Sequence, residues 1–295
     1  MTAGTSPGTG TRVLVTGAAS GLGRAIAAHY AAAGCRVLVT DLAEPAEPLA
    51  GEVSWHRLDV RSDAEWAAVR DWCETHWGGL DVLVNNAGVA AAGRVERIED
   101  ADWEWILDIN LRGVVRGCRT FVPLLKRQGG GHVVNVASLA ALTNLPGMSS
   151  YNVSKAAVVS LSETLRHELA PWGIHTTVVC PGFVPTNLDS GLRSPDPVLA
   201  HQATRLIQKG RVTPEQVAEQ VAEAVARRRF LVLTHPEGRR AVRLKRLWPA
   251  LVDRRIAAVW RRTRAKLDEQ DAREAHGAQD THGARHTEDT REDTA

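Results

Sequence analysis

The sequence lacks the features that mark secreted, metal-binding and membrane-spanning proteins. Its four cysteines lie far apart and form no CxxC pair, so we interpret them as small buried residues in a reducing compartment, not as a disulfide framework. No cluster of histidines and cysteines suggests a metal site, and none is expected. No apolar run reaches the roughly 18 residues that a membrane-spanning helix needs, which excludes an integral membrane protein.

The charge is nearly balanced, with a formal net value of +2 over 295 residues. This balance gives no overall reason to expect nucleic acid as a partner, although the charge is unevenly placed. The first residues, MTAGTSPGTGT, lack the basic and apolar segments of a secretory signal. We therefore expect a cytoplasmic protein with a disordered lead-in at residues 1–10 and one large α/β domain with appendages.

The domain opens with a strand, a glycine-rich turn and a helix. The β-branched run RVLVT leads into GAASGLG and then into an alanine-rich helix. In this turn Gly17 permits a tight bend, Gly21 lets the backbone approach a pyrophosphate, and Gly23 allows close helix packing. The helix N-terminus adds N–H donors, so Ser20 and Leu22 join the predicted cofactor site. The alternative is a glycine-rich turn without a ligand, which its place between strand and helix disfavours.

A second strand, CRVLVTD, ends in a carboxylate at Asp41. This residue lies about twenty positions beyond the glycine turn, as a dinucleotide-binding unit requires. A carboxylate there can accept both adenosine-ribose hydroxyls and repels a 2′-phosphate, which favours NAD. The alternative is that Asp41 is an ordinary turn residue after a strand.

The stretch SLAALTNLPGMSSYNVSK, residues 138–155, combines a hydroxyl, a phenol and an ammonium group. If Tyr151 opens a helix, Lys155 follows one turn later on the same face. Ser138 ends a buried strand, HVVNVAS, and the loop between brings strand end and helix start together. The pKa of a free phenol is near ~10, and an adjacent cation lowers it. Tyr151 can then exchange a proton with an alcohol or carbonyl, although a lone YxxxK is more often a solvated pair.

This S…YxxxK pattern resembles that of the short-chain dehydrogenase/reductase family, and other motifs follow in the family's order over residues 11–236. The resemblance implies an α/β fold with a doubly wound, Rossmann-like parallel sheet, helices on both faces and a ligand crevice at the carboxyl ends of the strands. It also implies further cofactor contacts from the third strand end, the NNAG motif, the catalytic helix and the PGFVPT motif: Asp59, Val60, Asn86, Ala87, Gly88, Tyr151, Lys155, Pro181, Gly182, Val184 and Thr186.

The resemblance further implies the mechanism. Tyr151 donates a proton to a carbonyl oxygen while NADH delivers hydride to the carbon, and oxidation reverses both steps. Ser138 steadies the developing oxyanion. Lys155 lowers the pKa of the phenol and binds the nicotinamide ribose. Asn110, within ILDINLRGVV, matches the family's helix asparagine, which helps to hold a water between the lysine and solvent.

Cofactor and substrate choice have weaker signals. Family members that use NADP often carry a basic residue where this chain has Ser20 and Leu42, so NAD is favoured over NADP. Residues after the catalytic serine are mostly apolar, which favours a hydrophobic secondary alcohol or ketone over a sugar. Steroid, retinoid-like, fatty and aryl substrates all stay open. The alternative from another class is an NAD-binding sensor without turnover, which would have no use for Tyr151 with Lys155.

The predictions of an oligomer and of a lid over the substrate site rest on less specific features of the sequence. By analogy with relatives, we expect a homodimer or homotetramer built on the helices around residues 110–127 and 151–172. Residues 187–211 are predicted to be an irregular, mobile lid, because lids are commonly long loops with little core of their own.

The C-terminal extension is first basic and then acidic. In residues 237–266 large apolar side chains recur at helical spacing with arginines between them, and Pro249 is expected to bend or divide the helix. One interpretation is a basic amphipathic helix in peripheral contact with an anionic membrane. The interpretation we favour is that this stripe packs on its own subunit or a neighbour. Residues 267–295 are nearly devoid of large apolar side chains and are expected to be a disordered tail.

Overall fold

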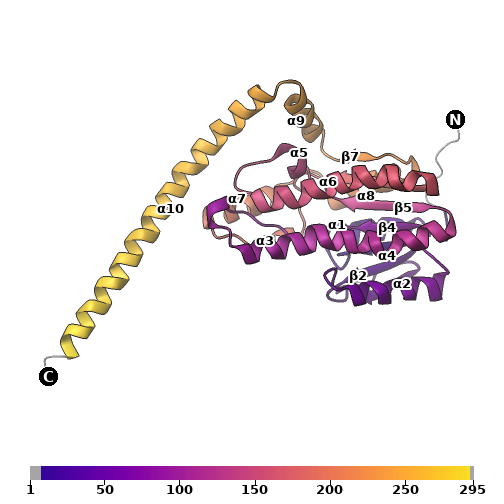
Figure 1. Ribbon diagram of the computed structural model, residues 1–295, viewed down its shortest axis with the longest axis horizontal. Helices are drawn as coiled ribbons and strands as arrows, with labels where there is room; N and C mark the ends of the chain where they lie inside the picture. The colour runs from indigo at the N-terminus through magenta and orange to yellow at the C-terminus, as the bar shows by residue number, and fades with distance from the viewer. Residues whose placement is uncertain (1–7, 293–295) are drawn as a thin grey trace.

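The computed structural model describes residues 8–292, with side chains through residue 273, and contains one seven-stranded sheet between two layers of helices (Figure 1). The strand order is β3-β2-β1-β4-β5-β6-β7, and every neighbouring pair is parallel. The order reverses between β1 and β4, so a crevice opens there at the carboxyl ends of the strands. The doubly wound α/β fold predicted from the sequence is confirmed.

The first half alternates strands and helices with short connections. Strands β1 and β4 bury nearly all of their residues, which explains why their sequences are continuous apolar runs and not alternating ones. The edge strand β3 is only partly buried. The elements are β1 (Arg12–Thr16), α1 (Gly21–Ala32), β2 (Arg36–Asp41), β3 (Val53–Arg57), α2 (Asp63–Trp77), β4 (Val82–Asn85) and the short helix η1 (Val95–Arg97).

The middle of the chain carries the long helices that flank the catalytic motifs. The interruption expected near Asn110 is confirmed, because a π-helical turn, η2, separates α3 from α4. The catalytic helix α6 begins two residues before Tyr151. The elements are α3 (Asp100–Leu107), η2 (Asp108–Arg112), α4 (Gly113–Gln128), β5 (Gly131–Val136), α5 (Ala140–Thr143), α6 (Ser149–Leu169), η3 (Ala170–Trp172) and β6 (Ile174–Cys180).

The prediction that residues 187–211 are irregular is wrong, because they contain a helix of twelve residues, α7. Pro197 occupies its first turn, and Leu199, Ala203 and Ile207 recur every four residues and are buried. The elements from here to the end are η4 (Asn187–Asp189), α7 (Pro197–Gln208), α8 (Pro214–Ala226), β7 (Leu231–Leu233), α9 (Pro236–Leu247) and α10 (Pro249–Glu292).

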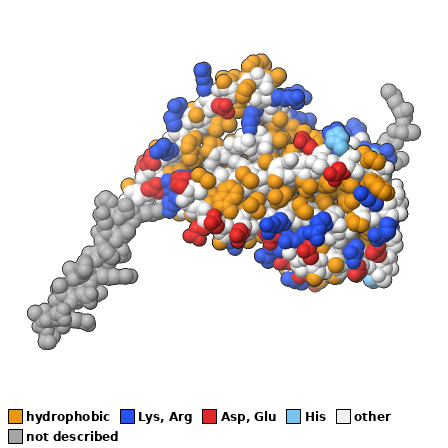
Figure 2. Space-filling view, viewed as in Figure 1, with side chains coloured by type: hydrophobic (Ala, Val, Ile, Leu, Met, Phe, Trp, Pro, Cys, Tyr) orange, Lys and Arg blue, Asp and Glu red, His pale blue; other side chains and the backbone are white. Residues whose placement is uncertain are grey.

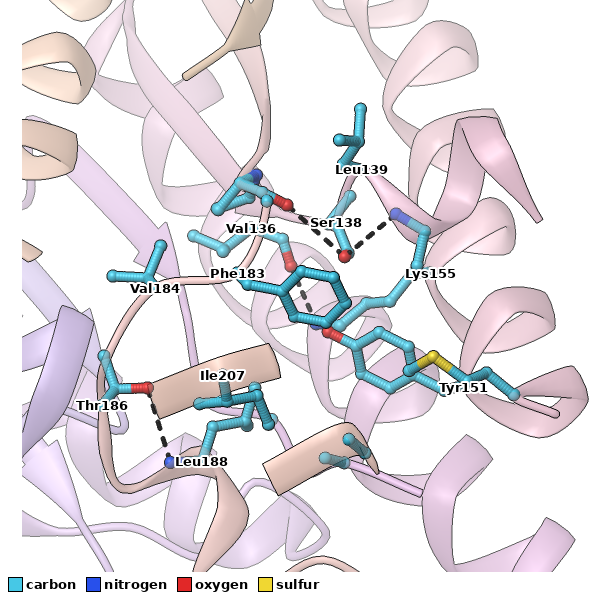
Figure 3. A pocket seen from close by; sticks show the side chains of 18 of the residues that line it. Val136, Ser138, Leu139, Tyr151, Lys155, Phe183, Val184, Thr186, Leu188 and Ile207 are labelled. Carbon is cyan, nitrogen blue, oxygen red and sulfur yellow. Dashed lines mark hydrogen bonds between the residues drawn. The ribbon is translucent and has the colours of Figure 1, made fainter. Parts of the chain in front are cut away.

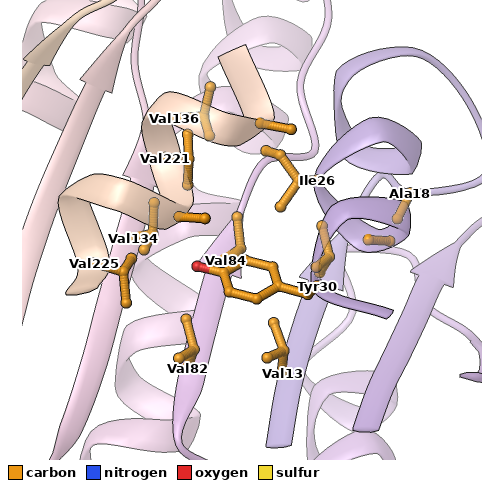
Figure 4. Close-up of a cluster of buried hydrophobic side chains, with 14 of the residues drawn as sticks. Val13, Ala18, Ile26, Tyr30, Val82, Val84, Val134, Val136, Val221 and Val225 are labelled. Atoms are coloured by element: carbon orange, nitrogen blue, oxygen red, sulfur yellow. The ribbon is translucent and has the colours of Figure 1, made fainter. Parts of the chain in front are cut away.

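Each face of the sheet has its own core. On one face α1 and α8 pack over the central strands, and Figure 4 shows the ring of Tyr30 surrounded by valines from β1, β4, β5 and α8. The hydroxyl of Tyr30 is buried and has no hydrogen-bond partner among the described residues. On the other face α2, α4 and α6 cover the sheet around Trp66 and Phe121. The two cores fix the strand ends from which the site is built.

The described residues near both ends of the chain make ordered contacts or form helices. Gly10 donates a backbone hydrogen bond to Gly34, while the first seven residues of the expected lead-in lie outside the described residues. Pro249 divides the extension into α9 and α10, as predicted. Of the tail expected to be disordered, residues 267–292 are described as a continuation of α10, in which Leu267 is fully buried. Leu267 packs with Ala92, Leu199 and Ala203. None of the described helices is long and apolar enough to cross a lipid bilayer.

Candidate active site

Two adjoining cavities lie at the carboxyl end of the sheet. The first is the more polar of the two, spans about 1280 Å³ including its mouth, and is lined by the glycine turn and the ends of β2, β3 and β4. The second is mostly apolar, spans about 990 Å³ including its mouth, and is lined by Ser138, Tyr151, Lys155 and the loop after β6. Every predicted site residue lines one of the cavities except Asn110, which is fully buried beside them.

The glycine turn is locked to the NNAG motif. The amide of Asn86 donates to the carbonyls of Thr16 and Gly17 at 2.9 and 3.1 Å, and the Thr16 hydroxyl accepts from the backbone N–H groups of Asn86 and Ala87. A Cβ atom on Gly17 would lie 2.7 Å from Ala87 Cα, and one on Gly23 would lie 2.1 Å from the Gly17 carbonyl oxygen. No side chain fits at either glycine, so the motif forms a rigid cradle.

The cradle fits a dinucleotide pyrophosphate. Ser20 occupies the N-cap of α1 but its side chain makes no capping hydrogen bond, which leaves N–H groups of the first helical turn available to an anion. Gly21 and Leu22 line the same cavity. The glycine turn therefore retains the donors that a phosphate needs.

Two aspartates mark the far side of this cavity. Asp41 accepts backbone hydrogen bonds from Ala19 at 2.9 Å and Leu42 at 2.7 Å, which ties the end of β2 to the glycine turn. Asp59 pairs with Arg61, whose Nη2 lies 2.7 Å from its carboxylate, and this hydrogen bonding holds the pKa of Asp59 below its usual value. Arg61 was not predicted from the sequence; it lines the cavity, with Val60 beside it.

The proposed catalytic side chains come from β5 and α6. Tyr151 and Lys155 lie one helical turn apart and are 7% and 4% exposed. Figure 3 shows both beside Ser138 at the end of the apolar cavity. Ser138 accepts a hydrogen bond from the Ala140 N–H at 3.2 Å, and Lys155 Nζ donates to the carbonyl of Val136 at 3.0 Å. The strand end and the helix are thereby held together.

Burial dominates the electrostatics of this cluster. It raises the pKa of Tyr151, and a hydrogen bond with Ser138 opposes that shift only in part. It lowers the pKa of Lys155 to about 8, so the amine is still mostly protonated at neutral pH. We expected the lysine to lower the pKa of the phenol, and the net direction is the opposite. A neighbouring cation lowers the pKa of a phenol, but burial raises it because a phenolate is costly to desolvate, and only the first effect can be expected from the sequence motif.

Asn110 connects the π-turn to the active site. Its amide accepts from the N–H of Val89 at 2.8 Å and donates to the Val89 carbonyl at 3.0 Å and to Ser154 at 3.1 Å. A Cβ on Gly88 would lie 3.1 Å from Asn110 Oδ1 and 3.2 Å from Lys155 Nζ. The asparagine thus fixes the segment after NNAG immediately beside the lysine.

His235, which sequence reasoning missed, supports the turn after β6. Its Nδ1 accepts from the N–H of Gly182 at 3.0 Å, and its Nε2 lies 3.2 Å from the Phe183 carbonyl. The ring is buried, and a Cβ on Gly182 would approach it to 3.0 Å. The available signal was its position at the carboxyl end of the last strand, where the other site residues also occur.

The loop after β6 closes the junction of the two cavities. Pro181, Gly182 and Val184 line the apolar cavity, and Thr186 lines both. A Cβ on Gly21 would lie 3.1 Å from Thr186 Cβ, so this loop rests on the glycine turn. Most of the remaining lining is apolar and includes residues of α7: Leu139, Ala140, Leu145, Met148, Phe183, Leu188, Leu192, Ala203 and Ile207.

A nucleotide cradle that adjoins a buried Ser-Tyr-Lys cluster at the end of a parallel sheet defines a nicotinamide-dependent oxidoreductase. The family model described as short chain dehydrogenase matches residues 11–197. The chain belongs to the short-chain dehydrogenase/reductase family, as the sequence motifs predicted.

Curated relatives support this assignment. The chain is 35% identical over 221 residues to a 2-(R)-hydroxypropyl-CoM dehydrogenase of Xanthobacter autotrophicus, covering 70% of this chain and 88% of that protein. It is 34% identical over 216 residues to the 3-oxoacyl-acyl-carrier-protein reductase FabG of Thermotoga maritima, covering 70% and 86%. The protein is therefore an NAD(P)-dependent oxidoreductase that acts on alcohols or ketones.

Solved structures agree with the fold. A short-chain dehydrogenase/reductase from Burkholderia phymatum in complex with NAD superposes with a TM-score of 0.78 at 34% identity, covering 83% of this chain and 96% of that one. A 3-ketoacyl-(acyl-carrier-protein) reductase from Brucella melitensis complexed with NADH gives 0.68 at 28% identity, covering 76% and 96%.

Proposed function

We propose that the protein transfers hydride between NAD(H) and a hydrophobic secondary alcohol or ketone, with Tyr151 as general acid and base. The observation that carries this proposal is the position of the Tyr151 phenol, buried beside Ser138 at the end of a mostly apolar cavity. Such a cavity suits a substrate whose reacting oxygen is its main polar group.

In this mechanism the bound nicotinamide supplies or accepts the hydride. Ser138 donates a hydrogen bond to the substrate oxygen, and Tyr151 gives that oxygen a proton in reduction or removes one in oxidation. The raised pKa of Tyr151 keeps the phenol protonated and ready to act as an acid. In oxidation, the ammonium group of Lys155 stabilises the phenolate that forms, and Asn110 keeps the adjoining backbone in place.

Preference for NAD(H) over NADP(H) is supported by the adenosine side of the polar cavity. Asp41 and the uncharged Leu42 line this side, so a 2′-phosphate would meet a carboxylate and no cation from either residue. Arg61 also lines the cavity, but its guanidinium pairs with Asp59. The relatives from Burkholderia phymatum and Brucella melitensis were solved with NAD and NADH.

Turnover with a panel of ketones tests the proposed function. NADH consumption is expected with hydrophobic ketones such as aryl, steroid and medium-chain alkyl ketones, and little is expected with sugars. Tight NADH binding without turnover across the whole panel would contradict the proposal and favour a sensing role for the bound nucleotide.

We also propose a homodimer or homotetramer built on α4 and α6, by analogy with relatives. The outer face of α6 exposes Val153, which is 49% accessible. Light scattering at micromolar concentration is expected to give a mass of two or four chains. A strict monomer would refute this proposal without touching the catalytic one.

A further inference from the structure

The bend between α9 and α10 exposes large apolar side chains. We call residues 243–255 the elbow. Within it Leu247, Trp248 and Leu251 are 64%, 57% and 46% exposed. Exposed leucine or tryptophan is ordinary when isolated, but a cluster of three within five residues marks an interaction surface.

The elbow is also strongly basic. Residues 236–266 contain eleven lysines and arginines against two acidic residues, so this segment carries +9 while the whole chain carries only +2. Arg243, Arg246, Arg254 and Arg255 are exposed on either side of the apolar cluster. Figure 2 shows the result at the top of the molecule, where hydrophobic side chains lie between blue ones.

The chain on both sides of the apolar cluster at residues 247–251 is anchored to the domain. On the α9 side, Lys245 Nζ donates to the carbonyl of Leu142 at 2.9 Å. On the α10 side, Trp260 packs with Leu199 and Leu267. The expectation that the stripe packs on its own subunit therefore describes these anchored parts and not the apolar cluster at residues 247–251, which lies at the bend between α9 and α10 (Figure 1).

We propose that the elbow docks the protein on an anionic lipid bilayer. Trp248 and the two leucines enter the interfacial layer, where tryptophan is favoured because one part of its ring system is apolar and its N–H is polar. The arginines bind lipid phosphates, and the net charge attracts the protein to a negative surface.

Charge decides between this occupant and the alternatives. The elbow contains five lysines and arginines against one aspartate, a net charge of +4, so two copies that met elbow to elbow would bring like charges together, which opposes such contact. A nucleic acid would neutralise the arginines but would leave Leu247 and Leu251 without an apolar partner. An anionic bilayer offers an apolar environment to Leu247, Trp248 and Leu251 and phosphate groups to the arginines.

Docking would bring the apolar cavity to the membrane. Gly238 of α9 lies against Leu139, so close that a Cβ on it would be 2.8 Å from the leucine side chain, and Leu139 lines the cavity. The elbow and the cavity are thus joined through one helix. The inference that the substrate comes from the membrane rests on the proposed function, whereas the inference that the protein docks on the membrane does not.

Vesicle flotation with the full chain tests the proposal. Vesicles of phosphatidylcholine mixed with phosphatidylglycerol are expected to bind the protein, neutral phosphatidylcholine vesicles to bind several-fold less, and high salt to release it. Trp248→Glu with Leu251→Glu is expected to weaken binding by about tenfold or more. Trp55→Glu is the matched control, because Trp55 of β3 is also exposed, at 37%, but lies outside the elbow, and it should bind normally.

A second pair of variants separates local from net charge. Arg243→Glu with Arg246→Glu is expected to weaken anionic-vesicle binding, whereas Arg227→Glu with Arg229→Glu, two exposed arginines just after α8, should not. NADH binding by each variant checks that it is folded, independently of turnover. The proposal is overturned if the full chain does not bind anionic vesicles, or if both arginine pairs reduce vesicle binding equally. It is also overturned if the protein does not bind vesicles and the change of Trp248 and Leu251 lowers the oligomer mass.

Discussion

The two sides of the crevice are held by different kinds of contact. On the nucleotide side, Asn86 bonds directly to the backbone of the glycine turn, and Gly17 and Gly23 have no room for a Cβ atom. On the substrate side, α7 is held from outside by side chains of α10, which pack on Leu199 and Ala203 and accept one hydrogen bond from the Val198 N–H. A backbone cradle has one geometry, whereas a helix held by side chains can be repositioned by substitution. We therefore expect the glycine turn to fix how the cofactor binds, and substitutions in α7 and α10 to be able to change which substrates bind.

Four charged side chains make the outer attachment. Asp196, fully buried just before α7, accepts from Arg94 at 2.8 Å and from Arg97 at 3.1 Å. Asp271 of α10 binds the same two arginines, with distances to Arg94 of 2.7 and 2.8 Å. Arg94 holds the pKa of Asp271 below its usual value. The two aspartates thus share two arginines, and α10 is tied to the start of α7.

The largest effect is expected from changing Tyr151, which lies where the nucleotide side and the substrate side of the crevice meet. Tyr151→Phe removes the proton donor and little packing, so kcat is expected to fall by about a thousandfold or more. NADH binding, measured by fluorescence, should be nearly unchanged. Tyr30→Phe is the matched control, because Tyr30 lies in the core and its hydroxyl has no hydrogen-bond partner among the described residues. A near-normal rate for Tyr151→Phe would show that the assigned mechanism is wrong.

The nucleotide side is tested by changing cofactor preference. Asp41→Ala with Leu42→Arg removes a carboxylate that repels a 2′-phosphate and adds a charged donor. The ratio of kcat/KM for NADPH to that for NADH is expected to rise by about a hundredfold, since a hydrogen bond to a charged group contributes about 1.5–3 kcal/mol. A preference of the unmodified protein for NADPH would contradict the role given to Asp41.

Sequence reasoning succeeded where the constraint is local. Gly17 and Gly23 must be glycine because of contacts within one turn and its neighbour, so their spacing alone identifies the cradle. Tyr151 and Lys155 share one helix, so their relative position follows from helical geometry. The family order of the motifs then predicted the sheet.

It failed where the constraint is distant. The helical spacing of Leu199 and Ala203 was present in α7, but their partner Leu267 lies in a segment whose composition suggested disorder. The role of His235 depends on Gly182, which lies in the loop after β6, far away in the sequence. The net pKa shift of Tyr151 depends on total burial, which no short motif encodes.

A smaller effect is expected from the buried lysine of the apolar cavity. Burial lowers the pKa of Lys155 from 10.5 to about 8. Between these values the unfolded chain binds more protons than the folded one, so this residue makes the protein more stable as pH rises through that window. Between pH 7 and 9 the unmodified protein should gain about 1 kcal/mol relative to Lys155→Met.

Urea unfolding of both proteins without cofactor, at several pH values, measures this difference. The comparison of the two proteins cancels the cysteines, whose raised pKa values, about 12 for Cys73, Cys118 and Cys180, act in the opposite direction at high pH. Parallel pH profiles for the two proteins would mean that Lys155 is not desolvated as described.

The smallest effect tests the substrate side. Asp271→Asn weakens the attachment of α10 to Arg94 and Arg97, so α7 should lie less firmly over the apolar cavity. KM for a hydrophobic ketone is expected to rise about threefold, as suits a partly exposed ion pair. The Kd for NADH should not change, because the cradle is built from other contacts. Leu267→Ala, which removes the buried contact with Leu199 and Ala203, should act in the same direction.

Asp268→Asn is the matched control for this last change. Asp268 lies on the same helix, but its carboxylate is 63% exposed and faces Arg264 of α10 itself, so its loss should leave both constants unaltered. If Asp271→Asn changed NADH affinity as much as ketone KM, the two sides of the crevice would be mechanically coupled. The contrast between a fixed cradle and an adjustable cover would then be wrong, because a contact of α10 with Arg94 and Arg97 would also control the glycine turn.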